Sequence, residues 1–243
     1  MSHGYVDVHC HIVYRVDDGS KSLDMTLKMV DMAYESGTRI MIATPHYEIG
    51  RYENNNEKIK SRFNEIKAAA EKKYPDFKVF LGHEVMYTYG IPDRLERGEI
   101  NTMAGSKYVL IEFGYEDAVS FIKEAVEEVI GYGYIPIIAH VERYANVMKK
   151  LDNVGELIKK GALIQVNTST VAGKYGRGMR RKVLKLIKND MVHFLGTDAH
   201  NDTNRNPDIG GCLEVLKKKV DEEKINEIFR DNALKVINGE TID

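Results

Sequence analysis

Short apolar runs alternate along this chain with longer segments in which apolar residues recur at helical spacing. Seven runs of six to nine residues are bounded by turn-forming or charged residues, a pattern typical of buried strands. The runs are residues 6–11, 40–46, 79–84, 108–113, 135–140, 162–167 and 192–200. Helical spacing predicts helices over 23–36, 54–73, 117–130, 153–160, 178–189 and the last 40 residues. This order predicts an α/β protein with a parallel sheet.

The first apolar run favours a closed barrel over an open sheet. Alternation along a strand places Asp7, His9 and His11 on one face, and Val6 and Val8 on the other. A polar face toward a barrel axis and an apolar face toward surrounding helices is what a site at a barrel mouth requires. The chain also lacks the GxGxxG and GxxxxGK[ST] phosphate loops of many open sheets.

Composition narrows the class of protein further. With 43% apolar and 30% charged residues and no change of composition along its length, residues 1–243 are expected to form a single globular domain. The net charge of −2 gives no basic surface for nucleic acid, and no apolar run is long enough to insert into a membrane. Two cysteines and no visible secretory leader predict a soluble protein of the reducing cytoplasm.

Histidines and acids stand at the ends of these runs. Imidazole and carboxylate are ligands for borderline and hard divalent ions, and the carboxyl ends of barrel strands meet at one mouth. The pattern therefore predicts a multinuclear metal centre. Its candidate ligands are His9, His11, His46, Glu84, Glu112, His140, Asp198 and His200.

Each of these features also has a simpler interpretation. A His-x-His pair occurs on exposed strands, and a strand-end glutamate can pair with an arginine of the barrel. Asp18, within Asp17-Asp18-Gly19, is as typical of a turn as of a ligand. The repetition of such residues at strand ends favours the metal centre.

Two arginines near the predicted ligands indicate that the substrate carries a phosphate. Arg143 lies three residues after His140, and Arg205 lies five residues after His200. Guanidinium groups beside a cationic centre suit a substrate with several anionic oxygens. Either arginine alone is more typical of an ordinary surface, and only the combination indicates a phosphate site.

The chain resembles the polymerase-and-histidinol-phosphatase (PHP) superfamily of phosphoesterases. The resemblance extends from residue 5 to about residue 210 and rests on the motifs HxH, DDG, TPH, GHE, IEF, AHVER and TDAH. Within this superfamily, the chain most resembles the bacterial PHP-type protein tyrosine phosphatases of capsule and exopolysaccharide gene clusters. This closer resemblance rests on the segments VDDGSKS, RYEN, YVLIEF and AHVERY. The resemblance implies a distorted seven-stranded (β/α)7 TIM-like barrel with three divalent ions, normally manganese, with iron, zinc or magnesium as alternatives. It adds Asp18 to the ligands and makes Arg143 and Arg205 the phosphate-binding residues.

The resemblance also implies an activity and a partner. We expect hydrolysis of phosphotyrosine on proteins by attack of a metal-bridging hydroxide, with the tail of a bacterial tyrosine autokinase as the substrate. A proton for the leaving group is expected from His46, Asp18 or a metal-bound water. The competing interpretations are a small-molecule PHP phosphoesterase, such as histidinol-phosphate phosphatase, and a non-catalytic metal-stabilised binding module.

Three further features remain outside this centre. His83 should point away from Glu84 along the strand and is expected either to pack or to support a ligand from behind. His193 opens the last strand at the end opposite the site and is expected to be structural. The basic run 174–182 is more typical of a solvated helix start than of a surface that recruits an acidic or phosphorylated tail.

Overall fold

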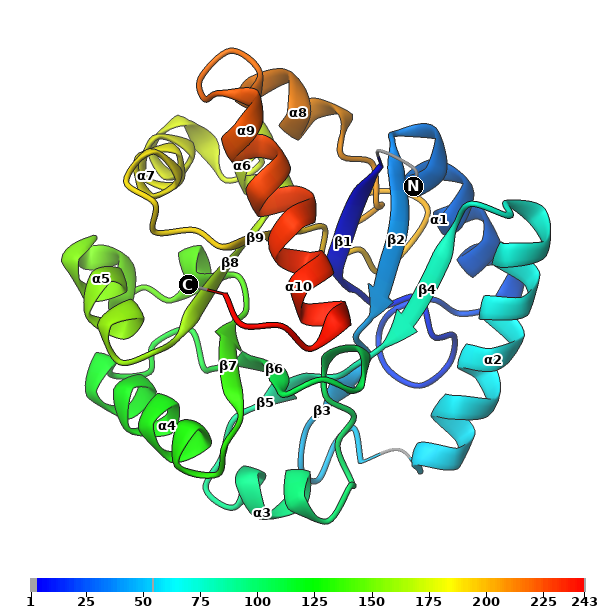
Figure 1. Ribbon diagram of the computed structural model, residues 1–243, viewed down its shortest axis with the longest axis horizontal. Coiled ribbons are helices and arrows are strands. Elements are labelled where there is room, and N and C mark those ends of the chain that lie inside the picture. Colours follow the sequence, from blue (N-terminus) through cyan, green and yellow to red (C-terminus); the bar gives the residue numbers. More distant parts are fainter. Residues whose placement is uncertain (1–3, 54, 243) are drawn as a thin grey trace.

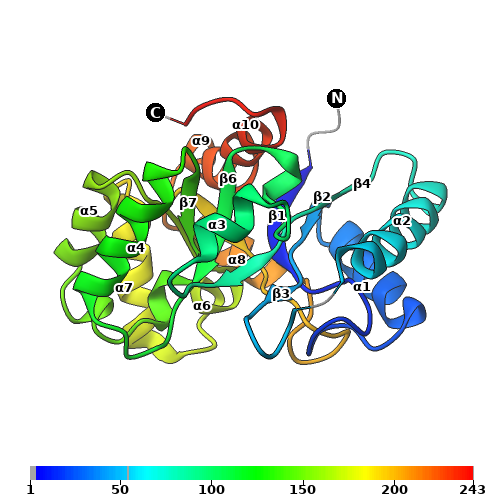
Figure 2. The ribbon, with the colours of Figure 1, turned by 90° about the horizontal axis from the view of Figure 1, so that it is seen from below.

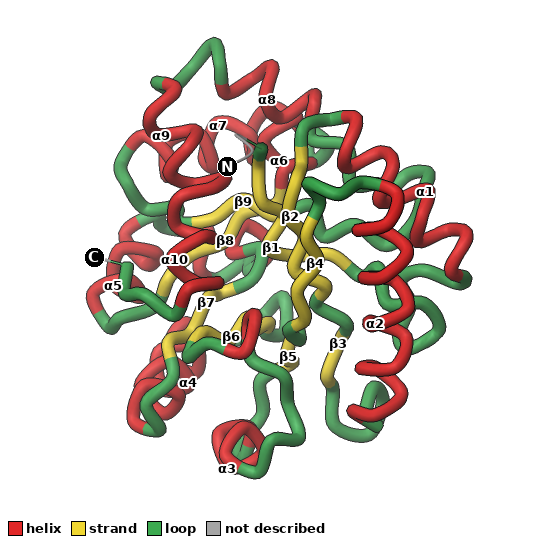
Figure 3. The backbone as a smooth tube through the Cα atoms, turned by 45° about the vertical axis from the view of Figure 1, so that its right-hand side comes forward, coloured by secondary structure: helices red, strands yellow, loops and turns green. Residues whose placement is uncertain are grey.

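The strands form two parallel sheets surrounded by helices. The computed structural model describes residues 4–53 and 55–242, and every strand pair in it is parallel. The smaller sheet has the order β1 (Tyr5–Cys10), β2 (Thr38–Ala43), β4 (Lys78–Leu81). The larger sheet has the order β3 (His46–Tyr47), β5 (Glu84–Met86), β6 (Tyr108–Glu112), β7 (Ile135–Ile138), β8 (Leu163–Asn167), β9 (Phe194–Gly196). Figures 1 and 3 show the strands at the centre of the molecule with the helices outside them.

All seven predicted runs contain strands, but the prediction of seven continuous strands is wrong for two of them. The run 40–46 divides into β2 and β3, and the run 79–84 divides into β4 and β5. Pro45 has no N–H group to continue a ladder. At Gly82 a Cβ atom would lie 2.9 Å from Met103 Sδ, so any larger residue would have to displace the Met103 side chain. Each break passes the chain from the smaller sheet to the larger one.

The outer edges of the two sheets meet at the end of β1. An isolated parallel bridge joins Cys10 to Ala199, just beyond β9. The N–H of His11 donates to Ala199 O at 2.8 Å, and the N–H of Asp198 donates to His9 O at 2.7 Å. The sheets are therefore curled toward each other, and the end of β1 lies beside the segment that follows β9.

The helices cover the outside of the sheets, and their bounds agree closely with most predictions. They are α1 (Leu23–Glu35), α2 (Asn56–Lys73), α3 (Ile91–Glu96), α4 (Val119–Gly131), α5 (Asp152–Lys159), α6 (Thr168–Ala172), α7 (Gly176–Lys188), α8 (Gly210–Leu216), α9 (Glu222–Asn226) and α10 (Asn232–Asn238). The short helices α3 and α6 were not predicted. The C-terminal segment is not helical throughout, because residues 217–221 separate α8 from α9.

One end of the curled sheets is closed by α10. This helix lies across the centre in Figure 1 and on the side away from β3 in Figure 2. Its Ala233 and Val236 pack in one buried cluster with Val8 and Phe194, and the Tyr108 hydroxyl donates to Glu240 O at 2.7 Å. The strand ends on the opposite side are left free for a site. Within residues 4–53 and 55–242, no helix combines the length and the hydropathy that crossing a membrane requires.

Candidate metal centre

The carboxyl ends of the strands bring all nine predicted ligand residues into one connected cluster. Each of them has a nitrogen or oxygen atom within 3.7 Å of another member. Three subsets each present donor atoms within 4.8 Å of one another, which is close enough to hold one metal ion. The subsets are His9, His11, Glu84, Asp198; His11, His46, His200; and His46, Glu84, Glu112.

Glu84 lies at the middle of the cluster. Its Oε2 atom is 3.1 Å from Nε2 of both His9 and His11, and 3.2 Å from His46 Nδ1. Its other oxygen is 2.7 Å from His140 Nε2. Oε2 is buried and makes no hydrogen bond to any described residue. A buried carboxylate oxygen among several imidazole nitrogens, without a hydrogen bond of its own, fits a position shared between cations.

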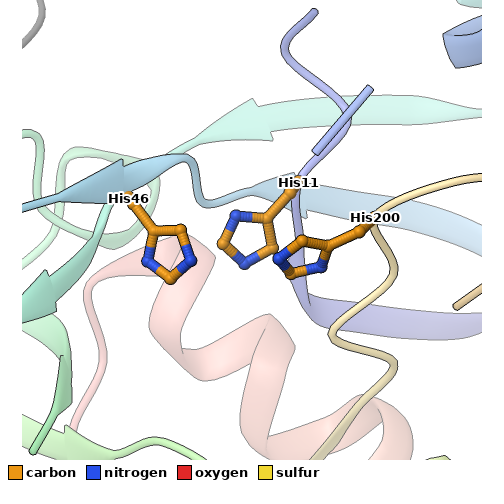
Figure 4. Close-up of side chains that lie close together, drawn as sticks. All are labelled: His11, His46 and His200. Atoms are coloured by element: carbon orange, nitrogen blue, oxygen red, sulfur yellow. The ribbon is translucent and has the colours of Figure 1, made fainter. Parts of the chain in front are cut away.

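A second group of donors lies toward solvent. Figure 4 shows the imidazoles of His11, His46 and His200 side by side, arriving from three separate segments. Asp18 Oδ1 lies 3.5 Å from Nε2 of His46 and from Nε2 of His200. His200 Nε2 is buried without a hydrogen bond to any described residue, so it too is available as a ligand atom.

The strand register explains why these residues meet. His46 on β3 pairs with Glu84 on β5, and Glu112 on β6 pairs with Met86, two residues after Glu84. His46 and Glu84 are the first residues of β3 and β5, and Glu112 is the last residue of β6, so this register brings their side chains to one mouth. The break at Pro45 is part of this arrangement, because it starts β3 at His46.

Two members of the cluster have left-handed backbone conformations. His140 has φ of 31° and Asp198 has φ of 53°, values that residues other than glycine rarely adopt. The His140 N–H donates to Gln165 Oε1 at 2.7 Å, and the Asp198 N–H donates to His9 O at 2.7 Å. These hydrogen bonds hold the strained turns that aim both side chains at the cluster.

Residues behind the donors fix their orientation, and the sequence analysis did not identify them. Asp17 Oδ2 is 2.8 Å from His11 Nδ1 and accepts the N–H of His46 at 2.9 Å. Gln165 Oε1 lies 3.2 Å from His9 Nδ1, while Asn167 Nδ2 donates to Asp198 Oδ2 at 3.0 Å. Gln165 and Asn167 alternate on a buried strand as His9 and His11 do, so the same rule would have found them.

Both predicted phosphate-binding arginines lie at the edge of the cluster. Arg143 Nη2 is 2.5 Å from Asp198 Oδ2, and Arg205 Nη2 is 2.8 Å from Asp198 Oδ1. Arg143 sits on the 3-10 turn Val141–Arg143 directly after His140. Both guanidinium groups line the cavity over the metal centre, which has a volume of about 320 Å³. Tyr52 and Tyr115 stand at the same cavity.

Electrostatics favour the ionised form of two carboxylates of the cluster, Glu84 and Asp198. Burial raises the pKa of Glu84, but the imidazoles around it, led by His9 and His46, hold that pKa well below its usual value. Burial likewise opposes ionisation of Asp198, and His9 and Arg143 reverse the effect, so its pKa is lowered. Burial lowers the pKa of His200 to about 4. The pKa values of His11, His46 and His140 are raised, because neighbouring carboxylates outweigh the effect of burial, and divalent metals would bind as these imidazoles lose their protons.

The two histidines predicted not to be ligands lie outside the cluster. His83 Nδ1 accepts the N–H of Asn101 at 2.8 Å, and its ring lies beside Tyr47. His193 Nδ1 accepts the N–H of Ile164 at 3.0 Å. Neither side chain points to the metal centre, as predicted.

Comparison with known proteins places the chain in a family. The family model described as "Capsular polysaccharide synthesis, CpsB/CapC" matches residues 5–238. The chain is 33% identical to CapC of Staphylococcus aureus over 237 residues, covering 98% of this chain and 90% of that one. It is 31% identical to the tyrosine-protein phosphatase CpsB of Streptococcus pneumoniae, covering 98% of this chain and all of CpsB.

A solved structure is similar over nearly the whole chain. It comes from work on YwqE of Bacillus subtilis and CpsB of Streptococcus pneumoniae, which are described as metal-dependent tyrosine phosphatases. The TM-score is 0.90 at 28% identity, and the match covers 98% of this chain and 96% of that one. The His, Glu and Asp cluster at the strand ends is thus the metal-binding candidate in a fold shared with metal-dependent enzymes. The chain belongs to the CpsB/CapC family of capsular polysaccharide synthesis proteins.

Proposed function

We propose that this protein is a metal-dependent protein tyrosine phosphatase. The observation that carries the proposal is the pair of guanidinium groups, Arg143 and Arg205, which share one cavity with seven of the nine potential metal ligands. Metal ions bound to these ligands and the two guanidinium groups would place positive charge on both sides of the cavity. This suits a phosphoryl group, whose negative charge is spread over several oxygens. Among phosphate esters, phosphotyrosine is favoured as the substrate because relatives similar over the full chain are named tyrosine-protein phosphatases.

We propose that the centre takes three divalent ions, with manganese the expected metal. The three donor subsets support this number. The proposed ligands are those that the family motif implies: His9, His11, Asp18, His46, Glu84, Glu112, His140, Asp198 and His200. Bound divalent ions would supply Lewis acidity toward phosphoryl oxygens and activate water as the nucleophile.

The protein's own residues then have separate roles. Arg143 and Arg205 bind the phosphoryl oxygens and stabilise the charge that grows on them during displacement. Asp198 orients both arginines through its two oxygens. His46 and Asp18, at the solvent side of the cluster, are the residues proposed to hold a proton near the leaving oxygen. A phenol needs little help to leave, because its pKa is near 10.

The fold proposal is a distorted seven-stranded barrel that forms one domain over 1–243. The Cys10–Ala199 bridge supports it, since it links the free edges of the two sheets. Counting each interrupted run as one strand leaves seven. The proposed compartment is the cytoplasm, where the buried, unpaired Cys10 and Cys212 would stay reduced.

The proposed substrate is the phosphorylated tail of a tyrosine autokinase of capsule synthesis. Membership of a capsular polysaccharide family supports this assignment. The test is phosphate release by the manganese-loaded protein from a phosphotyrosine peptide and from histidinol phosphate. We expect turnover of the peptide and little of histidinol phosphate. Turnover of histidinol phosphate alone would establish the small-molecule phosphoesterase instead, and turnover of neither would indicate a binding module.

A further inference from the structure

A large basic groove lies between α7 and α8, outside the metal centre. Its volume is about 860 Å³. One wall is formed by cationic side chains of α7: Arg177, Arg180, Arg181, Lys185 and Lys188. Lys218 and Lys219 stand on the other wall, and Glu214 is the only carboxylate among the residues that line it. We call this feature the α7–α8 groove.

The positive charge of the groove is largely unpaired. Lys218 contacts Glu214 at 2.6 Å, but the other six cations form no ion pair within residues 4–53 and 55–242. The whole chain has a net charge of −2, so this excess is local. The helix α7 buries Val183, Leu186 and Ile187 against the core and turns its cations outward. A solvated helix start, the simpler expectation for the basic run, does not account for a concave surface of this size.

The groove also offers apolar surface beneath its cations. Ala172, Leu184 and Val215 line it, and Leu184 and Val215 are half-buried side chains. The aliphatic stems of lysine and arginine extend such a surface while their charged ends stay in solvent. An aromatic ring that carries a phosphate matches this combination, because its ring packs on apolar atoms and its phosphate meets guanidinium groups.

A second cavity lies between the groove and the metal centre and shares lining residues with both. This cavity, of about 240 Å³, shares Ala172 and Gly211 with the α7–α8 groove. It shares Arg143, Asp198 and Arg205 with the cavity over the metal ligands. The three cavities therefore follow one another across the molecule, each sharing lining residues with the next. An extended polypeptide with one residue in the metal centre would pass the second cavity to reach the basic groove.

We propose that the α7–α8 groove binds a second phosphotyrosine of the same substrate chain while the first occupies the metal centre. This inference rests on the proposed phosphatase function, because it assigns the substrate to that site. A concave groove in the same series of cavities as the metal centre favours a polypeptide over an anionic membrane, which needs an exposed face. The groove thereby selects substrates that carry clustered phosphotyrosines.

The experiment compares peptides that differ in their second anionic group. One set has two phosphotyrosines separated by roughly two to six residues, which span about 10 to 25 Å when extended. In matched peptides the second phosphotyrosine is replaced by glutamate or by glutamine. Binding is measured by fluorescence anisotropy with non-hydrolysable phosphonate analogues, and turnover is measured as phosphate release from the phosphopeptides. We expect the doubly phosphorylated peptide of best spacing to bind at least tenfold more tightly than both matched peptides.

The variant removes three exposed cations of α7: R181A, K185A and K188A together. The control removes three exposed lysines of α2, on the other side of the molecule in Figure 1: K58A, K60A and K72A. We expect the α7 variant to lose about tenfold in affinity for the doubly phosphorylated peptide, in line with three exposed charge contacts. Its turnover of p-nitrophenyl phosphate should not change. The α2 variant should match the wild type in both assays.

Three results would overturn the proposal. If the doubly phosphorylated and glutamine peptides bound with equal affinity, the groove would not bind a second anion. If the glutamate peptide bound as tightly as the doubly phosphorylated one, the groove would not select phosphotyrosine. Loss of sedimentation with phosphatidylserine vesicles in the α7 variant, with peptide binding unchanged, would assign the groove to a membrane. A failure of the proposed phosphatase function would be distinguishable from these results. No phosphate would then be released from any substrate, while peptide binding measured by anisotropy would still depend on the α7 cations.

Discussion

Arg143 and Asp198 form a short ion pair at the boundary between the metal ligands and the cavity. The distance from Nη2 of the arginine to Oδ2 of the aspartate is 2.5 Å. Asp198 Oδ1 lies 3.7 Å from His9 Nε2, on the side of the proposed metals. One carboxylate thus faces both the proposed metal site and the proposed phosphate-binding arginines. Substitutions on its two sides should have separable effects.

Arg205→Ala should lower kcat/KM for a phosphotyrosine peptide by roughly 100-fold, because it removes one donor to the phosphoryl oxygens in the transition state. Metal content should stay at the wild-type level, since the guanidinium is not a ligand. Asp198→Asn should lower both metal content and turnover. Elemental analysis beside steady-state kinetics checks both expectations. Arg97→Ala, which changes an exposed arginine outside the cavity, is the control.

Asp17→Asn should weaken metal binding by about 10- to 100-fold. Asp17 holds the ring of His11 through its contact with Nδ1, and an amide replaces that charged contact with a weaker one. Titration with a competing chelator measures the change. Asp24→Asn on α1 is the matched control, because Asp24 is exposed and forms no ion pair with any described residue. Unchanged affinity in the Asp17 variant would mean that Asp17 does not orient His11.

Gly196→Ala should destabilise the fold and disturb the metal centre together. A Cβ atom at this position would lie 2.7 Å from His9 Cβ and 3.3 Å from His9 N. The cost should be about 1 to 3 kcal/mol, as for other overpacked cores. Gly178→Ala on α7 meets nothing within 4 Å and should stabilise the protein by about 0.5 to 1 kcal/mol. Urea unfolding of both variants, with metal analysis, tests the pair.

The free energy of unfolding should fall as the pH drops from 6.5 toward 4, in part through His193. Burial lowers the pKa of this histidine to about 4. The unfolded chain, with a pKa near 6.5, takes up the proton first, so acid favours unfolding within this window. His193→Asn should reduce the slope, because its Oδ1 replaces the acceptor Nδ1 without titrating. Urea unfolding of the metal-free proteins at several pH values measures the slopes, and equal slopes would contradict the assignment.

The sequence predicted the parts of the site that follow from local patterns. Strand periodicity and run ends were enough to find His9, His11 and Glu84, because the carboxyl ends of parallel strands share one mouth. Asp18 was singled out by resemblance, whereas its neighbour Asp17 makes the buried contact with His11. Which of the two aspartates contacts His11 depends on how the turn after β1 folds back, and no local sequence pattern determines that.

The passage of the chain from one sheet to the other likewise could not be predicted from local patterns. Pro45 lacks the N–H group that would continue a ladder, but this does not reveal that the chain then enters a second sheet. It does so because the Thr44 N–H donates to Cys10 O in one sheet while Pro45 O accepts from Glu84 N in the other. These are contacts between residues far apart in the chain. The α7–α8 groove depends on tertiary contacts for the same reason, since its two walls are assembled from separate helices.

Metal reconstitution tests the proposed metal-dependent phosphatase activity most directly. The protein is stripped with a chelator, manganese is added back in measured amounts per chain, and phosphate release from a phosphotyrosine peptide is recorded at each step. We predict no turnover in the stripped protein and a rise to a plateau as about three ions bind per chain, and we expect Glu84→Gln to stay below that plateau. Full turnover in the stripped protein, or in the Glu84 variant, would contradict this prediction.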